Sequence, residues 1–390
     1  MSVKVADGIY WVGAIDWNIR DFHGYITHRG TTYNAYLVVD EKIALVDTVK
    51  HGFADEMLAR VKEIVDPGRI DFVISNHVEP DHSGSLNEAM AAAGNAELIA
   101  SEKGKEGLSR YYGGKWRFRT VKTGDELSLG RKKLMFIMTP MLHWPDSMMT
   151  YVKADRVLLS NDAFGQHIAS SQRFDSELPA AVLEDAATDY YANILMPLGQ
   201  LVAKKLEEVA KLNIGIDTIA PSHGIIWKTP GTIIGYYSRW AGAGTKKKVV
   251  IVYDTMWQST DMMAKSIAKG AIETGVEVKL MHLRSNPWSD AVKEILDASA
   301  VIVGSPTLNN TMYPTVGGFL TYVMGLKPKG KMWGIFGSYG WGGGAVKAIK
   351  DELEKENHRV VETLDVRFRP DGNEIGRCIE MGRRIASQVG

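Results

Sequence analysis

The run from His77 to His82 (His-Val-Glu-Pro-Asp-His) constrains the fold of this chain more than any other feature. It directly follows an apolar stretch at residues 71–75, which has the composition of a buried strand. Four potential metal ligands therefore fall on one turn at a strand end. Facing carboxylates and imidazoles repel one another or must hold protons, so such a loop is costly unless it binds a cation. The run predicts a metal site at the edge of a sheet.

Three further apolar stretches end in the same kind of residue. Residues 133–138 are followed by His143, residues 157–160 by Asp162, and residues 216–220 by His223. Binding crevices of α/β proteins form at the carboxyl ends of strands, so we expect all four strand ends to share one site. With β-type stretches at 9–13, 32–39 and 43–46 and a helical pattern at 52–65, the pattern predicts a sandwich with helices outside.

The types of donor indicate which metals suit the site. The candidate ligands are four histidines and three carboxylates: His77, His82, His143, His223, Glu79, Asp81 and Asp162. Such a set is enough for two metals with one bridging carboxylate, and it suits iron or manganese better than structural zinc. Zinc stays open, because the affinity order favours it over ferrous iron. The single cysteine, Cys378, excludes an internal disulfide and an iron–sulfur cluster held by this chain alone.

The second part of the chain alternates strand and helix five times. A small, flexible and then charged segment at residues 241–248 precedes it, so we expect one domain at 1–245 and another at 246–390. The expected strands are 248–253, 277–283, 299–304, 332–337 and 359–365. Repeated βα units of this spacing predict a doubly wound parallel sheet.

Three loops of this second part, after its first, third and fourth strands, resemble the flavin site of flavodoxins. The first is rich in hydroxyls at a helix N-terminus, which binds anions, and it lacks the glycine–lysine signature of nucleotide triphosphatases. Serine and threonine are also common helix caps, so this loop alone decides little. The candidate FMN-binding residues are Thr255, Met256, Trp257, Gln258, Ser259, Thr260, Pro306, Thr307, Leu308, Asn309, Asn310, Ser338, Tyr339, Gly340, Trp341 and Gly342.

The motifs resemble a known family. Hydrolases of the metallo-β-lactamase fold usually have His-x-His-x-Asp-His where this chain has Glu79 in place of the second histidine. That change, with His143-Trp-Pro-Asp, Asn-Asp162-Ala-Phe and Pro-Ser-His223-Gly, resembles the flavodiiron proteins (A-type flavoproteins, the rubredoxin:oxygen oxidoreductase and nitric oxide reductase family). The resemblance implies a metallo-β-lactamase-like αβ/βα sandwich followed by a flavodoxin-like domain. One departure is Gln258, where the family leads us to expect glycine.

The resemblance also implies roles for the ligands. His77, Glu79 and His143 would hold one iron, Asp81, His82 and His223 the other, and Asp162 would bridge them. Glu79 adds a hard anionic donor, which favours the iron forms of a redox cycle. His23 and Tyr190 are weaker candidates for a part in catalysis, and His167 for orienting a ligand.

The implied function is reduction of dioxygen to water, nitric oxide to nitrous oxide, or both. Electrons would come from a rubredoxin or a reduced deazaflavin coenzyme and pass through FMN to the irons, in a head-to-tail homodimer or dimer of dimers. Two alternatives remain open, namely a dinuclear zinc hydrolase with a flavodoxin-like docking domain and a flavin electron carrier whose first domain lacks metal. Zero net charge, no apolar N-terminal segment and no long apolar run predict a cytoplasmic protein without nucleic-acid or membrane partners.

Overall fold

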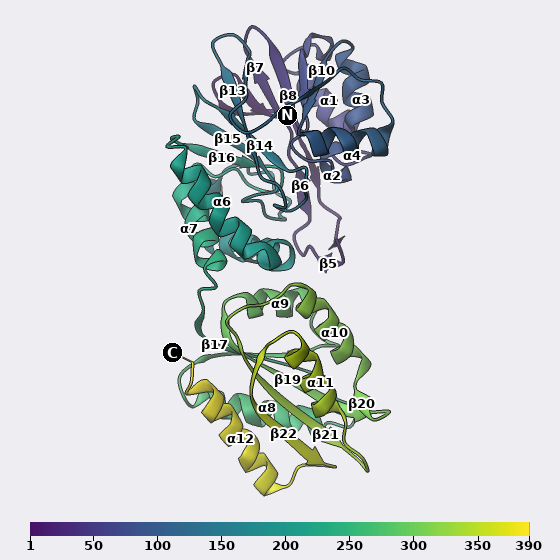
Figure 1. The fold of residues 1–390 in the computed structure, drawn as a ribbon, viewed down its shortest axis with the longest axis vertical. Coiled ribbons are helices and arrows are strands. Elements are labelled where there is room, and N and C mark those ends of the chain that lie inside the picture. The colour runs from purple at the N-terminus through teal and green to yellow at the C-terminus, as the bar shows by residue number, and fades with distance from the viewer. Residues whose placement is uncertain (390) are drawn as a thin grey trace. The chain divides into compact units, whose positions relative to one another are not determined.

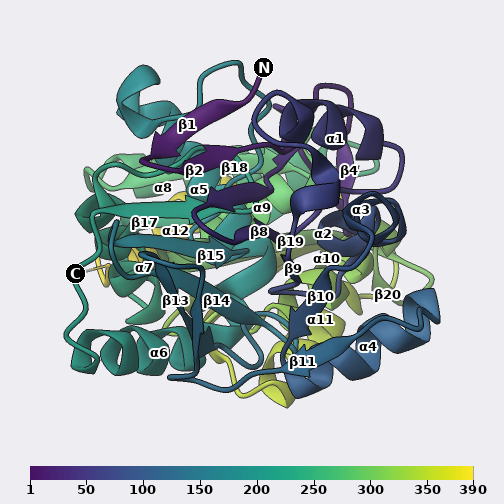
Figure 2. The ribbon, with the colours of Figure 1, turned by 90° about the horizontal axis from the view of Figure 1, so that it is seen from above.

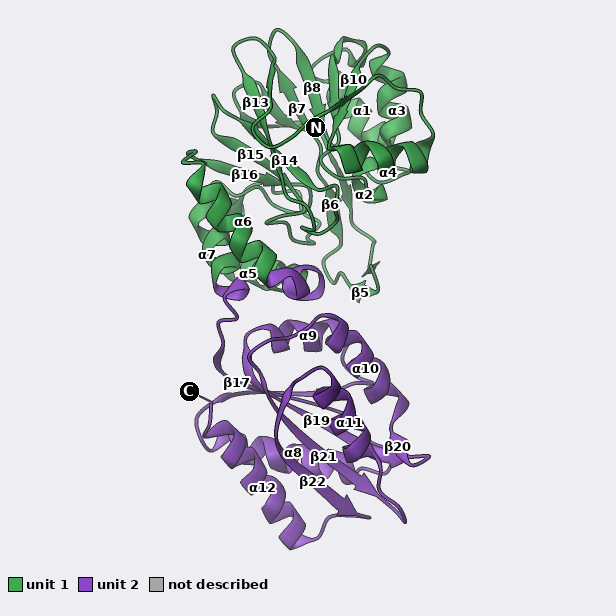
Figure 3. Ribbon diagram, in the orientation of Figure 1, with its two compact units in different colours: residues 1–190, 200–238 green, residues 191–199, 239–390 purple. Residues whose placement is uncertain are grey.

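The computed structural model describes residues 1–389, which form two units with separate cores (Figure 3). Unit 1 comprises residues 1–190 and 200–238, and unit 2 comprises residues 191–199 and 239–390. The short segment 191–199 thus packs with unit 2, although unit 1 supplies the chain on both sides of it. The division into one domain at 1–245 and another at 246–390 stays a prediction.

Unit 1 contains two sheets packed face to face (Figure 1). The larger sheet has the order β1 (Val3–Ala6), β2 (Ile9–Trp11), β7 (Tyr36–Val39), β8 (Ile43–Val46), β9 (Phe72–Ile74), β10 (Glu97–Ala100) and β11 (Phe118–Thr120). The smaller has the order β12 (Glu126–Ser128), β13 (Lys133–Met138), β14 (Met148–Val152), β15 (Val157–Asn161) and β16 (Thr218–Pro221). Apolar residues from both sheets, such as Val46, Ile74, Phe136 and Leu159, form one buried core. The predicted sandwich is confirmed.

The expected single strand at 32–39 is wrong. It is divided into β6 (Thr31–Tyr33), which pairs with β3 (Ala14–Asp16), and β7, which pairs with β2 and β8. The break falls at Asn34, whose side chain accepts a hydrogen bond from Trp11 Nε1 at 2.7 Å and donates to Pro221 O at 2.8 Å. These contacts hold the backbone at Asn34 between two sheets, which no local pattern reveals. A second small hairpin joins β4 (Asp21–Phe22) to β5 (Tyr25–Ile26).

Helices lie outside both sheets of the sandwich. Figures 1 and 2 place α1, α3 and α4 beside the larger sheet and α6 and α7 beside the smaller one. The helical segments of this part of the chain are α1 (Ala54–Lys62), η1 (Pro67–Arg69), α2 (Pro80–Ser83), α3 (Leu86–Ala93), α4 (Glu102–Tyr112), η2 (Asp175–Glu177), α5 (Ala180–Tyr190), η3 (Tyr191–Leu195), η4 (Met196–Leu198), α6 (Gly199–Lys211) and α7 (Pro230–Ala241).

Unit 2 is a doubly wound sheet in the order β18-β17-β19-β21-β22, with all neighbouring pairs of this path parallel. Its strands are β17 (Lys246–Tyr253), β18 (Glu277–His282), β19 (Ala298–Leu308), β20 (Thr311–Met312), β21 (Met332–Tyr339) and β22 (Arg359–Arg367). Its helices are α8 (Ser259–Ile272), α9 (Trp288–Leu296), α10 (Pro314–Gly325), α11 (Ala345–Lys355) and α12 (Gly372–Ala386). α8 and α12 cover one face of this sheet, and α9, α10 and α11 the other (Figure 1). This order is that of flavodoxin-like sheets.

Within residues 1–389, no helix has the length and apolar character that crossing a bilayer requires.

Candidate metal centre and flavin site

The candidate metal ligands gather where strands of the two facing sheets end. Glu79 occupies the N-cap position of the short helix α2. The first residue of this helix is Pro80, which suits a helix start because its missing N–H is not needed there. The tight turn brings Asp81 and His82 back toward His77. His143 lies in the loop between β13 and β14, Asp162 directly after β15, and His223 two residues after β16.

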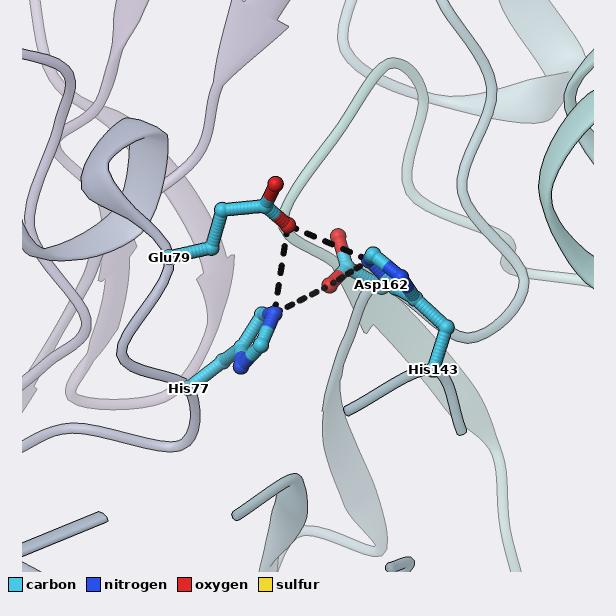
Figure 4. Close-up of side chains that lie close together, drawn as sticks. All are labelled: His77, Glu79, His143 and Asp162. Atoms are coloured by element: carbon cyan, nitrogen blue, oxygen red, sulfur yellow. Dashed lines mark hydrogen bonds and ion pairs between the residues drawn. The ribbon is translucent and has the colours of Figure 1, made fainter. Parts of the chain in front are cut away.

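The first ligand group consists of His77, Glu79, His143 and Asp162 (Figure 4). Glu79 Oε2 lies 3.2 Å from Nε2 of both His77 and His143. Asp162 Oδ2 lies 3.6 Å and 3.5 Å from the same two nitrogens. The four side chains come from three separate loops and point toward one common centre.

The second ligand group consists of Asp81, His82 and His223. Asp81 Oδ2 lies 3.3 Å from His82 Nε2 and 3.0 Å from His223 Nε2. The other oxygen of Asp162, Oδ1, lies 2.9 Å and 3.5 Å from these two nitrogens. Asp162 thus presents one carboxylate oxygen to each group, which is the geometry of a bridging ligand.

The donors fit a pair of metal ions. All seven side chains are buried or nearly so, yet Asp162 Oδ2 and Asp81 Oδ1 accept no hydrogen bond from residues 1–389. Buried carboxylate oxygens without partners are expensive, and two cations at these groups would satisfy them. Nitrogen and oxygen donors without sulfur suit iron.

Charge within this cluster is balanced by protons when no metal is bound. Burial lowers the pKa of His77, but Asp146 and Glu79 outweigh it and raise that pKa to about 10. For His143, burial is outweighed by Asp162 and Glu79, and its pKa is also raised to about 10. Burial raises the pKa of Asp162, whereas the neighbouring histidines hold it well below its usual range. Metal binding must therefore displace protons.

Asp146 and Asp47, neither predicted to have a role, hold the ligand loops. Asp146 Oδ2 lies 2.9 Å from His77 Nδ1 and accepts the Val78 N–H at 2.8 Å. Asp47 accepts from the Asn76 backbone at 2.7 Å and from Asn161 Nδ2 at 3.2 Å, so it joins the residues that precede His77 and Asp162. Outer partners of this kind fix the orientation of ligands.

The three weaker candidates all lie at the metal centre. His23 Nε2 lies 2.6 Å from Glu79 Oε1, and its side chain is 39% exposed. The Tyr190 hydroxyl donates to Asp162 Oδ1 at 3.1 Å. His167 contacts the His223 ring, with centroids 4.8 Å apart, and its Nδ1 lies 2.7 Å from the Thr31 hydroxyl oxygen. His167 therefore packs beside a candidate ligand without bonding directly to it.

The three predicted flavin loops meet in unit 2. A cavity of about 320 Å³ is lined by Met256, Trp257, Ser259, Pro306, Thr307, Ser338, Tyr339, Gly340, Phe368 and Arg369. Eight of these ten are predicted residues. The other predicted residues, Thr255, Gln258, Thr260, Leu308, Asn309, Asn310, Trp341 and Gly342, lie in the same loops but outside the lining. Phe368 and Arg369 belong to a fourth loop, after β22, which was not among the predicted residues.

The cavity and its rim fit FMN. No side chain of the described chain caps the N-terminus of α8, so its first N–H groups are available to an anion. Thr255 Oγ1, in the preceding loop, is buried without a hydrogen-bond partner among residues 1–389. Trp257 and Trp341 are 89% and 92% exposed, which is unusual for indoles unless they cover a ligand or partner.

Gln258 has the backbone conformation of a glycine. It is the N-cap of α8 and has φ +72°, in the left-handed region. The loop therefore keeps the shape that glycine would give it, at the cost of strain in a residue with a Cβ.

A buried two-metal ligand set and a flavin cavity within one chain define a class of protein, the oxidoreductases that combine FMN with a non-haem dinuclear site. Comparison with known proteins agrees. The model for the ODP family of β-lactamase-like domains matches residues 31–224, and the flavodoxin model matches residues 251–382.

Relatives match the chain over nearly its whole length. A nitric oxide reductase of Moorella thermoacetica is 50% identical, over 99% of this chain and 98% of that protein. A coenzyme F420H(2) oxidase of Methanothermobacter marburgensis is 44% identical over the same shares. The structure of rubredoxin oxygen:oxidoreductase from Desulfovibrio gigas matches with a TM-score of 0.97 at 39% identity, covering 100% of this chain and 98% of that one.

This chain belongs to the flavodiiron protein family. It is an oxidoreductase whose cofactors are FMN and a non-haem di-iron centre, and the zinc hydrolase alternative is not favoured.

Proposed function

We propose that the chain takes electrons from an external donor and reduces dioxygen to water, nitric oxide to nitrous oxide, or both. Asp162 is the strongest support, because its two oxygens face two separate donor groups, as the bridging ligand of a dinuclear centre would. When bound, FMN and the two irons supply the electron transfer, and the protein supplies placement and electrostatics.

We further propose that each of the two ligand groups holds one iron. His77, Glu79 and His143 hold one iron, Asp81, His82 and His223 hold the other, and Asp162 bridges them. FMN is held by the three loops after β17, β19 and β21, with the phosphate at the N-terminus of α8.

His23 and Tyr190 act on the ligands. The Tyr190 phenol is fully buried, and burial with the nearby Asp162 charge raises its pKa well above its usual value. It therefore keeps its proton at neutral pH and continues to donate to Asp162. His23, half-exposed and in contact with Glu79 Oε1, is placed to orient that carboxylate from the solvent side.

The donor is a rubredoxin or a reduced deazaflavin coenzyme. The chain has one cysteine and so cannot hold rubredoxin-type iron itself. The names of the relatives from Methanothermobacter and Desulfovibrio contain these two donors. Steady-state reduction of the bound flavin by each donor distinguishes them.

The experiment that tests the function is anaerobic reduction of purified protein, followed by separate titrations with dioxygen and nitric oxide. Flavin and iron absorbance are followed together. We expect at least one gas to reoxidise both cofactors, with water or nitrous oxide as product. Failure of both gases contradicts the proposal, and so does protein with zinc at both metal positions and no bound flavin.

Assembly and location are also proposed. A cytoplasmic head-to-tail homodimer, alone or paired as a dimer of dimers, would let the flavin of one chain serve the irons of another. Dilution to monomer is then expected to abolish electron transfer from flavin to iron, whereas an unchanged rate in the monomer would exclude this arrangement.

A further inference from the structure

We propose that Asp254, directly after β17, and Arg284, two residues after β18, are positioning residues for the FMN phosphate. They fix the loop that joins β17 to α8, so that the first N–H groups of α8 face the phosphate. This rests on the proposal that the phosphate lies at the N-terminus of α8. Neither residue lines the flavin cavity, so both would act through the backbone of the loop.

The Asp254 carboxylate is fully buried and joins three segments of unit 2. Its Oδ1 accepts hydrogen bonds from the Thr255 N–H at 2.6 Å and from Arg284 Nε at 2.8 Å, and it lies 3.2 Å from His282 Nε2. Its Oδ2 accepts a hydrogen bond from the Thr315 hydroxyl of α10. Burial raises the pKa of Asp254, but these contacts outweigh burial and lower that pKa below its usual value. The carboxylate therefore stays charged and holds the start of the loop to β18 and α10.

Arg284 holds the other side of Thr255. Its guanidinium donates both to Asp254 Oδ1 and to the Thr255 carbonyl oxygen. The N–H of Thr255 is thus bound by one member of the ion pair and its C=O by the other. The buried Thr255 hydroxyl is the polar group of this residue that has no partner among residues 1–389. A buried hydroxyl without a partner is costly unless a ligand accepts its hydrogen bond.

Further contacts hold the end of the loop and its neighbour. The hydroxyl of Tyr253, the last residue of β17, donates to Asp261 Oδ1 in the first turn of α8 at 2.6 Å. The Arg284 guanidinium lies 5.8 Å from the centroid of the Tyr313 ring, and the Tyr313 N–H donates to Ser305 Oγ at 2.8 Å. Ser305 directly precedes the second predicted flavin loop. The same cluster of contacts therefore fixes the first flavin loop at both ends and joins it to the second.

Charge alone and positioning predict opposite results for one substitution. Neutralising Asp254 removes a negative charge beside the proposed anion site, and this by itself would strengthen binding of a negatively charged phosphate. Loss of the hydrogen bonds that shape the loop would instead weaken that binding. The sign of the change in FMN affinity therefore distinguishes a positioning role from an effect of charge.

The test titrates flavin-free, full-length protein with FMN and with riboflavin, and compares wild type with Asp254→Asn, Arg284→Lys and Arg384→Lys. Lysine keeps the positive charge of Arg284, but it lacks the planar fork that reaches both Asp254 and the Thr255 carbonyl. Arg384 is the matched control, because it is an exposed arginine of α12 that pairs with Glu362 and lies outside the cavity lining.

We expect Asp254→Asn and Arg284→Lys each to weaken FMN binding about tenfold, the effect of losing one hydrogen bond between charged groups. Riboflavin has no phosphate, so its affinity should stay at the wild-type value. Arg384→Lys should bind both flavins as wild type does. Thr315→Val removes only the hydroxyl that donates to Asp254 Oδ2, and it should shift FMN affinity in the same direction. This variant keeps the test available if Asp254→Asn does not fold.

Tighter FMN binding by Asp254→Asn overturns the proposal, and so does wild-type FMN binding by Arg284→Lys, because charge alone would then account for the pair. Equal losses for FMN and riboflavin also overturn it, because the pair would then support the whole domain. If wild-type protein binds FMN no more tightly than riboflavin, the proposed position of the phosphate is wrong. If wild-type protein binds neither flavin, the proposed flavin site itself is wrong.

Discussion

At the residue scale, Asp162 connects the two ligand groups. Its Oδ2 faces His77 and His143, and its Oδ1 faces His82 and His223. No other carboxylate of the described chain approaches histidines of both groups so evenly. Removal of Asp162 should therefore affect both metals, whereas removal of any other ligand should mainly affect one.

We expect Asp162→Ala to lose both irons. Its metal affinity should fall by more than the roughly 10- to 100-fold that loss of an outer partner costs, because a direct bridging ligand disappears. His23→Ala, the matched control, removes a neighbour of Glu79 and should keep both metals while turnover changes. Iron content per chain after dialysis measures this, and equal content in the two variants would count against a bridging Asp162.

The left-handed backbone conformation of Gln258 leads to a prediction about the stability of unit 2. Glycine at this position removes the cost of holding a Cβ in the left-handed region, so Gln258→Gly should raise the free energy of unfolding of unit 2 by up to about 1 kcal/mol. Asn310, with φ +61°, is the matched control, because asparagine adopts this conformation more readily. Asn310→Gly should gain less. Chemical denaturation followed by flavin fluorescence measures both, and a destabilised Gln258→Gly would show that the side chain has another role.

At the scale of elements, the sequence pattern predicted the strands that end at the candidate ligands. It did not predict the residues that hold those ligands in place. The stretches that end at His77, Asp162 and His223 correspond to β9, β15 and β16, and each is a short apolar run that a local pattern identifies. β14, with the sequence Met-Met-Thr-Tyr-Val, was not predicted, because Thr150 interrupts its apolar run and its residues do not alternate. Asp146 lies 69 residues from His77 in sequence, so their contact depends on the packing of two sheets.

The start of α4 supports Asp146. The Ser101 hydroxyl caps this helix by accepting the Gly104 N–H at 2.9 Å, and it donates to Asp146 O at 2.7 Å. The cap thus fixes the segment from which the Asp146 carboxylate reaches His77. A helix distant from the ligands in sequence takes part in positioning one of them.

We expect Asp146→Asn to weaken metal binding at the first group by about 10- to 100-fold. Asparagine can still accept a hydrogen bond from the Val78 N–H. It lacks the negative charge that holds His77 Nδ1 in place and so keeps His77 Nε2 turned toward the metal site. Asp125→Asn, an exposed aspartate in a turn, is the control and should bind metal as wild type does. Competition with a chelator of known affinity measures the difference. Equal affinities for the two variants would show that Asp146 matters only for folding.

At the scale of the whole molecule, each unit has its own core and its own candidate cofactor site. The buried apolar clusters of the sandwich and of the doubly wound sheet share no residue. Because the cores are separate, the fold of each unit could be predicted from its own part of the sequence. The βα repeats predicted unit 2, and the strands that end in candidate metal ligands predicted unit 1. It also means that metal and flavin should stabilise different parts of the chain.

The metal-free protein should become less stable as pH rises. Histidines with raised pKa values contribute stability that is fully present below their unfolded pKa of about 6.5 and is lost as pH rises through the folded values. Those values are about 10 for His77 and His143 and about 9 for His82, so the loss falls between pH 7 and 10. Thermal unfolding of unit 1 with a chelator should show a falling midpoint over this range.

Metal-loaded protein is the control for that series. Metal binding removes the same protons, so loaded protein should show no comparable fall, and the stabilisation by metal should grow with pH. A flat or rising midpoint for the metal-free protein would show that its histidines are neutral at pH 7.

Residues 191–199 limit how the two units of this chain can be exchanged between family members. The segment packs with unit 2, where Tyr322 donates to Asn193 at 2.7 Å, yet it is encoded in the middle of unit 1. A single crossover near residue 240 between two family members would take this segment from one parent and its packing surface from the other. Recombinants of that kind would therefore begin with a mismatched contact between residues 191–199 and the rest of unit 2.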